Sequence, residues 1–132
     1  MLQQYIIYQG AKFTIEWYCD CKGKSSARDY FDTLLFERKK KFDYLMRRMG
    51  DGGKIQDEEK FRHEGDQIYA FKPKPDRFLC FFIKGAKIIV TNAFEKKADK
   101  LPPQEKEKAL RCKQDYIQRV KGGTYYGQEK NK

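Results

Sequence analysis

The spacing of hydrophobic residues predicts both strands and helices in the first half of the chain. Residues 13–19 alternate between hydrophobic and polar side chains, which is typical of a half-buried strand. Hydrophobic residues recur at near-helical spacing over residues 27–49 and predict one long helix that stops at Gly50. Ser26 precedes Asp29 by three residues, as in a helix-capping box. Residues 55–64 are polar, so we expect a loop or a short edge strand there.

The second half of the chain predicts three strands and a helix. Hydrophobic segments at about residues 66–72, 77–83 and 87–94 are separated by turns too short for a helical crossover, so these strands should be antiparallel. Pro102 and Pro103 favour the start of a final helix over residues 103–121, which ends at Gly122. We therefore expect an α+β fold whose mainly antiparallel, twisted sheet buries one face under the N-terminal and C-terminal helices.

The length of 132 residues fits one domain over residues 1–123, followed by a flexible tail at residues 124–132. No segment approaches the roughly 20 apolar residues that cross a bilayer. The N-terminus also lacks the layout of a signal peptide. These features predict a cytoplasmic protein that does not bind a membrane.

The four cysteines favour reduced thiols over a metal site. Cys80 and Cys112 occupy hydrophobic positions, where a thiol behaves as a small apolar side chain. Cys19 and Cys21 form a single pair, whereas a zinc site usually needs two such pairs at knuckle spacing. We expect no metal and no other cofactor, and the roles of Cys19 and Cys21 stay open.

The net charge of +10 predicts a polyanionic partner, either nucleic acid or an acidic protein. Eight lysines or arginines and three acids lie between Lys72 and Lys100. Several of these cations fall at the predicted strand ends, where they could form a phosphate-binding surface. Alternatively, they are solvated lysines that protect a sheet edge from aggregation.

Short motifs follow one another over residues 77–109. They are Arg-Phe-Leu-Cys-Phe-Phe from Arg77, Gly-Ala-Lys-Ile-Ile-Val from Gly85, Phe-Glu-Lys-Lys from Phe94, and then Lys100, Pro102 and Ala109. In this order they resemble the RelE/ParE toxin superfamily, and in particular its phage-derived, HigB-like branch. The resemblance is clear over residues 60–117 and looser over the first strand and helix.

This resemblance implies a RelE-like toxin of a type II toxin-antitoxin system. It implies a ribosome-dependent endoribonuclease that cleaves messenger RNA through attack of a 2′-hydroxyl on the neighbouring phosphate. The implied partners are messenger RNA, the ribosome and a small helix-turn-helix antitoxin from a neighbouring gene. Because the chain is basic, we expect an acidic or amphipathic antitoxin segment to lie across the basic groove and the helix pair.

Cleavage of this kind needs a group that holds the phosphate and groups that transfer protons. The guanidinium of Arg77 can hold a phosphate with two hydrogen bonds. Crowded lysines repel one another, which favours loss of a proton. The expected catalytic residues are Lys72, Arg77, Lys96 and Lys97. The residues expected to bind RNA are Lys74, Lys84, Lys100 and Tyr69.

Three other features bear on this site. Related nucleases often have an additional Tyr or His near its C-terminal part, and neither Asn92 nor residues 100–103 supply one, so Tyr69, Tyr116 or the tail tyrosines are expected to take over part of that role. His63 lies in a polar segment outside the motifs and is expected to be exposed. The basic run from Arg38 fits either a contact with ribosomal RNA or a solvated helix face.

A second class of function fits the same fold. The chain would then be a non-catalytic binder, either a ParE-like topoisomerase inhibitor or an inactive relative that only pairs with its antitoxin. ParE-type members do not need the cations at the strand ends, so the four expected catalytic residues favour cleavage. The fold alone does not decide between these functions.

Overall fold

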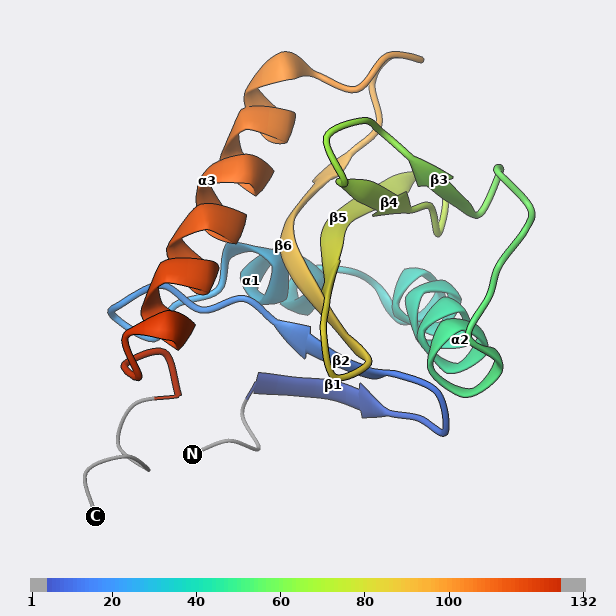
Figure 1. The fold of residues 1–132 in the computed structure, drawn as a ribbon. Helices are drawn as coiled ribbons and strands as arrows, with labels where there is room; N and C mark the ends of the chain where they lie inside the picture. Colours follow the sequence, from blue (N-terminus) through green and yellow to red (C-terminus); the bar gives the residue numbers. More distant parts are fainter. Residues whose placement is uncertain (1–4, 127–132) are drawn as a thin grey trace.

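A six-stranded sheet forms the centre of the molecule, with its strands in the order β1-β2-β6-β5-β4-β3 (Figure 1). The computed structural model describes residues 5–126. The strands are β1 (Ile6–Gln9), β2 (Thr14–Trp17), β3 (Phe61–His63), β4 (Tyr69–Phe71), β5 (Asp76–Ile83) and β6 (Lys87–Glu95). Neighbouring strands are antiparallel except β2 and β6, which are parallel. The predicted α+β fold with a mainly antiparallel sheet is confirmed.

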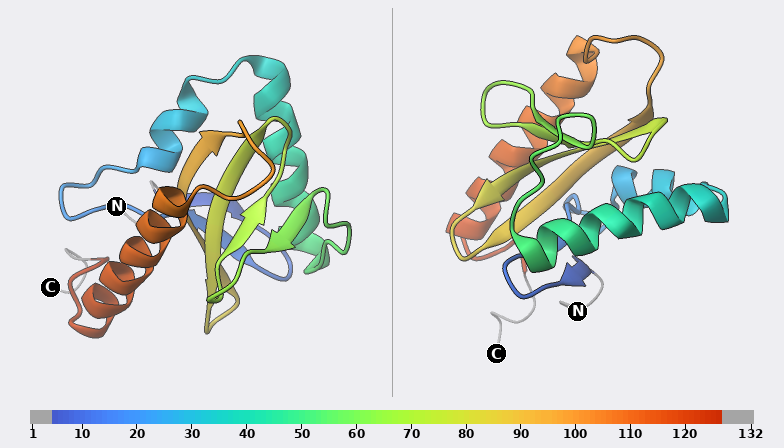
Figure 2. Two further views of the ribbon diagram at one scale, coloured as in Figure 1. Left: turned by 90° about the horizontal axis from the view of Figure 1, so that it is seen from above. Right: turned by 90° about the vertical axis from the view of Figure 1, so that its right-hand side faces the viewer.

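The three helices cover both faces of this sheet. They are α1 (Ser26–Asp32), α2 (Phe36–Gly52) and α3 (Pro103–Lys121). Figure 2 shows α2 and α3 on opposite sides of the sheet. In β5, Phe78 and Cys80 join the core under α1 and α2, whereas Leu79 and Phe81 join the core under α3. The expectation of one buried face was therefore wrong, and burial of both faces explains why β5 is continuously hydrophobic.

The long helix predicted over residues 27–49 is two helices. Ser25, rather than Ser26, caps α1, since its hydroxyl accepts a hydrogen bond from the Arg28 N–H at 3.2 Å. The Thr33 hydroxyl donates to the Tyr30 carbonyl at the other end of α1, at 2.6 Å. Leu35 then has an extended backbone, with φ −72° and ψ 160°, and α2 begins after it. Leu34 lies in the break and is buried, so the hydrophobic spacing in the sequence continues across it and gives no sign of two helices.

The strand β1 was not predicted, and its position depends on two glycines. Gly10 follows β1 and packs against Gly50, where a Cβ atom on Gly10 would lie 2.3 Å from the Gly50 carbonyl carbon. The N–H groups of Lys12 and Phe13 both donate to the Gly50 carbonyl, at 2.7 and 2.9 Å. Gly50 therefore serves close packing and does not end the helix. The helix ends instead at Gly53, which has a φ of 77°.

The predicted helix over residues 103–121 is confirmed as α3, but the predicted tail begins too early. Tyr125 is buried in the second core, and its hydroxyl accepts a hydrogen bond from the Cys19 N–H at 2.8 Å. The Tyr126 hydroxyl donates to the carboxylate of Glu16 at 2.6 Å. Residues 124–126 are thus part of the packed domain, and the rest of the expected tail lies outside the described residues. No helix within the described residues is long and apolar enough to cross a membrane.

The buried carboxylate of Asp76 joins both N-terminal helices to the start of β5. Asp76 accepts hydrogen bonds from the Tyr30 hydroxyl of α1 and from the Arg38 guanidinium of α2, whose Nε lies 3.0 Å away. A fully buried carboxylate is tolerated only when it is paired and hydrogen-bonded, as it is here. Arg38, the first cation of the basic run, therefore has a structural role.

We predict that Asp76→Ala lowers the free energy of unfolding by about 2 kcal/mol, since the Tyr30 hydroxyl and the partly buried Arg38 guanidinium lose their shared acceptor. Urea denaturation followed by circular dichroism measures this change. Asp99→Ala is the control, because the Asp99 side chain is fully exposed and should change stability by less than about 0.5 kcal/mol. Equal effects of the two substitutions would contradict the importance of the Asp76 cluster.

Candidate functional site

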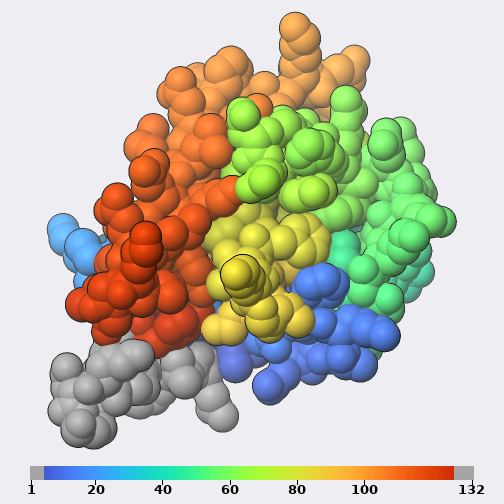
Figure 3. All heavy atoms as spheres, viewed as in Figure 1, coloured from blue at the N-terminus to red at the C-terminus, as the bar shows by residue number. Residues whose placement is uncertain are grey.

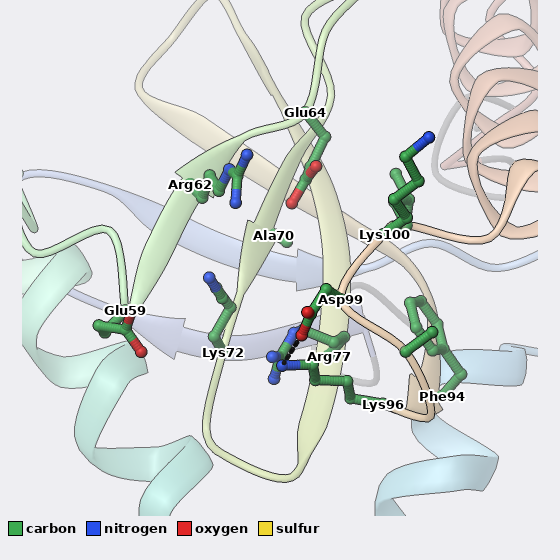
Figure 4. Close-up of a pocket in the computed structure, with 12 residues that line it drawn as sticks. Glu59, Arg62, Glu64, Ala70, Lys72, Arg77, Phe94, Lys96, Asp99 and Lys100 are labelled. Carbon is green, nitrogen blue, oxygen red and sulfur yellow. Dashed lines mark ion pairs between the residues drawn. The ribbon is translucent and has the colours of Figure 1, made fainter.

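A charged pocket of about 200 Å³ lies on the sheet face that carries α3, next to the segment that leads into this helix (Figure 4). Its walls come from β3, the end of β4, the start of β5 and the segment after β6. Five cations line it: Arg62, Lys72, Arg77, Lys96 and Lys100. Three acids also line it: Glu59, Glu64 and Asp99. The excess of cations favours an anion over a cation in this pocket.

The register of the sheet brings the central cations together. Arg77 of β5 is the partner of Phe94 in β6, and residues directly opposite in an antiparallel pair project from the same face. Ala70 is the partner of Leu79, so Lys72, two residues after Ala70, projects from the same face as Arg77. The backbone N–H of Lys96 donates to the Pro75 carbonyl at 2.8 Å, which continues this pairing past the end of β6.

Arg77 is the most buried cation of the pocket, with 8% of its surface exposed. Its Nη1 donates to the carbonyl of Asp76 at 3.0 Å, and among the described residues no acid lies within ion-pairing distance of it. Burial lowers the pKa of Arg77, although a guanidinium stays charged at neutral pH. The guanidinium lies between Lys72 and Lys96 (Figure 4). Its remaining donors suit the two-pronged binding of a phosphate.

Lys72 lies beside Arg77 and is 9% exposed. Its Nζ donates to the Glu58 carbonyl at 2.8 Å. Burial lowers the pKa of Lys72, and the positive charges of Arg77 and Arg62 lower it further. Lys72 therefore releases a proton more readily than an exposed lysine does, which suits it to acid–base chemistry.

Lys96 and Lys97 were both expected at the site, but only Lys96 lines the pocket. The Nζ of Lys96 lies 3.3 Å from the carboxylate of Asp99. Lys97 is exposed and lies outside the pocket lining. Phe94, two residues before Lys96, also lines the pocket, and successive side chains of an extended strand project to opposite sides.

Of the four residues expected to bind RNA, only Lys100 lines the pocket. Lys74 forms an ion pair with Glu59 and faces α2. Lys84 lies in the turn between β5 and β6, at the far end of β5 from the pocket, and Figure 3 shows this hairpin in yellow at the surface. Tyr69 stacks on Phe61 with ring centroids 5.4 Å apart and packs against the core under α2, on the opposite face of the sheet.

Four charged pocket residues were missed in the sequence: Glu59, Arg62, Glu64 and Asp99. Arg62 is the partner of Ala70, so it projects from the pocket face, and Glu64 follows with the same alternation. The carboxylate of Glu64 has no ion pair within the described part of the chain, and its charge opposes the lowering of the Lys72 pKa. The period of two over residues 61–64 was the available signal, but the segment is too short and polar to stand out.

The tyrosines expected to assist the site are elsewhere. Tyr116 is buried in the second core, where its hydroxyl lies 2.8 Å from that of Tyr126, and burial raises the pKa of Tyr116 to about 12. Among the described residues, Phe94 is the aromatic one that lines the pocket. His63 is exposed, as expected, and its ring packs near that of Tyr69 rather than in the pocket.

The thiol of Cys19 is buried, and burial raises its pKa to about 11, so this thiol stays protonated at neutral pH.

The fold and the pocket together define a small α+β protein with a cation-rich pocket on one sheet face. A family model described as phage-derived protein Gp49-like (DUF891) matches residues 29–114, which include every residue that lines the pocket. The chain belongs to this Gp49-like family, a family of RelE/HigB-like toxins. A search of curated proteins finds no match to the chain.

We predict that Arg77→Met raises the pKa of Lys72 towards the ordinary lysine value, because it removes the nearby charge that disfavours a second cation. Nuclear magnetic resonance titration of the lysine side chains measures this pKa. Arg111→Met is the control, since Arg111 is exposed on α3 and does not line the pocket. An unchanged Lys72 titration in Arg77→Met would show that these two charges do not interact.

Proposed function

We propose that this chain is the HigB-like toxin of a type II toxin-antitoxin pair and arrests growth by cleaving messenger RNA on the ribosome. One observation carries the catalytic part of the proposal: Arg77 is buried at a cationic pocket, beside Lys72 and without an acidic partner among the described residues. Membership of the Gp49-like family supports the toxin part.

In the proposed reaction, Arg77 holds two non-bridging oxygens of the scissile phosphate. The 2′-oxygen attacks phosphorus, and the bond from phosphorus to the 5′-oxygen breaks. The products are a 2′,3′-cyclic phosphate and a 5′-hydroxyl. Lys72 and Lys96 lie beside Arg77 and would stabilise the additional negative charge of the pentacoordinate state. Charges held in place before the reaction are effective because they need no reorganisation.

Two proton transfers complete the proposed reaction. Glu64 would accept the proton of the 2′-hydroxyl, because it is the pocket acid without an ion pair among the described residues. The other two acids, Glu59 and Asp99, pair with Lys74 and Lys96. Lys72 would give a proton to the departing 5′-oxygen, in keeping with its lowered pKa.

The proposed antitoxin is a small helix-turn-helix protein from a neighbouring gene. An acidic segment of it would occupy the pocket and exclude RNA, and binding would weaken as salt rises. The alternative function, a non-catalytic binder such as a topoisomerase inhibitor, is favoured by one feature: no Tyr or His is among the described residues that line the pocket.

We predict that Arg77→Ala slows cleavage by roughly 10²-fold or more, the usual effect of losing one preorganised charge-stabilising donor. Arg77→Lys should restore little, since an ammonium cannot reproduce the two-pronged geometry. Expression in a bacterial host, with primer extension on total messenger RNA and growth curves, measures both effects. Wild type should leave breaks inside translated frames. Intact messenger RNA with altered DNA supercoiling would instead establish the topoisomerase alternative.

The neighbouring lysines provide a matched pair for the same assay. Lys96→Ala should reduce cleavage, because Lys96 lines the pocket, whereas Lys97→Ala should leave cleavage close to that of wild type. Both substitutions remove one positive charge, so a general loss of electrostatic attraction would affect them equally. Equal losses of cleavage would contradict the assignment of the site to this pocket.

Glu64→Gln tests the proposed proton acceptor. We expect cleavage to fall by about 10²-fold, at the lower end of the range for a general base, because the amide cannot accept the proton. RNA binding should not weaken, since the substitution removes a negative charge from a cationic pocket. The limb of the pH–rate profile that reports the base should disappear. A retained profile would assign the base to another group.

A further inference from the structure

The outer face of α2 carries a row of alternating aromatic and basic side chains. Phe36, Lys40, Tyr44 and Arg48 are spaced four residues apart, so they lie along one line of the helix. The Phe36 and Tyr44 side chains are 70% and 57% exposed. The Nζ of Lys40 lies 5.4 Å from the centre of the Phe36 ring, and the guanidinium carbon of Arg48 lies 5.7 Å from the centre of the Tyr44 ring. These side chains are outside both hydrophobic cores.

A groove of about 380 Å³ lies between this row and the turn after β4. Five lysines line it, together with the single acid Glu37: they are Lys40, Lys41, Lys60, Lys72 and Lys74. The Nζ of Lys41 donates to the Lys74 carbonyl at 3.2 Å, which holds the turn against α2. The groove is therefore a built, strongly cationic surface.

Lys72 joins this groove to the candidate active site, since it lines both the groove and the pocket that contains Arg77. A polyanion with a phosphate in the pocket would meet the lysines of the groove next, and the exposed rings of α2 after them. Successive phosphates match a line of lysines, and bases stack on exposed aromatic rings.

We propose that single-stranded RNA bound in the pocket continues along this groove, and that Tyr44 and Phe36 stack on bases several nucleotides away from the cleaved bond. The inference rests on the proposed function, because it takes the ligand of the pocket to be RNA. A cationic groove with exposed rings is the usual composition of a surface that binds single strands without reading their sequence. The aromatic row on α2 thus extends the RNA contact beyond the reacting phosphate.

The spacing of the rings on α2 sets the length of RNA that can contact both the pocket and these rings. Phe36 and Tyr44 are eight residues apart on α2, or about 12 Å at 1.5 Å per residue. This distance corresponds to roughly three to four stacked nucleotides at about 3.4 Å each. An RNA of about three nucleotides would fill the pocket alone, whereas one of about 12 nucleotides, within the usual range of single-strand sites, would reach α2.

The test measures binding of these two RNAs, protected from cleavage by 2′-O-methyl groups, by fluorescence anisotropy. Tyr44→Ala should weaken binding of the long RNA at least about fivefold, since stacking contributes about 1–3 kcal/mol per base, and should leave the short RNA unaffected. Tyr44→Phe keeps the ring and should bind as wild type does. Lys40→Ala should reduce the slope of log affinity against log salt by about 0.7, the change for one phosphate contact.

Matched controls lie on the outer face of α3. Ile117→Ala removes an exposed apolar side chain and Lys121→Ala removes an exposed cation, and neither should change binding of either RNA. Thermal melting confirms that each variant is folded. If wild type binds both RNAs equally, or if Tyr44→Ala binds the long RNA as wild type does, the inference is wrong. It is also wrong if Tyr44→Ala loses only binding to an acidic protein partner, which would assign the surface to that partner.

Cleavage of unmodified RNA in a translating extract separates this inference from the proposed function. Cleavage that depends on Arg77 while Tyr44→Ala binds the long RNA normally would support the nuclease and overturn the α2 contact. Length-dependent binding that requires Tyr44, without any cleavage by wild type, would support the α2 contact and overturn the nuclease.

Discussion

The buried carboxylate of Asp76 is the interaction on which the rest of the structure depends. It joins α1 through Tyr30 and α2 through Arg38 to the first residue of β5. The next residue, Arg77, projects from the other face of the sheet, and its guanidinium bonds to the carbonyl of Asp76. Two consecutive residues therefore connect the helical layer on one face to the charged pocket on the other. A shift at the start of β5 would disturb both.

The sequence predicts the long regular elements of this fold and misses those that depend on distant contacts. The strands β5 and β6 and the helix α3 have hydrophobic patterns long enough to identify alone. The position of the strand β1 depends on the close packing of Gly10 against Gly50, two residues separated by most of the N-terminal half, and this packing is also why Gly50 does not mark the end of α2. Likewise, the Tyr126 hydroxyl donates a hydrogen bond to Glu16, which lies 110 residues earlier in the sequence. No local pattern reveals such a contact.

The residues of the candidate site were likewise predicted where a local pattern was sufficient and missed where strand pairing decides. Lys72, Arg77 and Lys96 were predicted because cations at adjacent strand ends usually meet. Lys97 and Lys84 do not line the pocket, because proximity in sequence does not give side chains a shared direction: Lys97 is exposed next to Lys96, and Lys84 lies at the opposite end of β5. The direction of a side chain depends on strand register, which is set by pairing between strands and not by composition.

The crowding of cations in the pocket has a consequence for how the free protein behaves in solution. Lys72 and Arg77 are both largely buried, and their like charges oppose the compact state. Any anion that binds only the native protein relieves this repulsion and raises the melting temperature in proportion to the logarithm of its concentration. The measured stability of this protein therefore depends on the buffer. If phosphate or sulfate binds the pocket, the melting temperature measured in these buffers would be higher than that measured in chloride at low ionic strength.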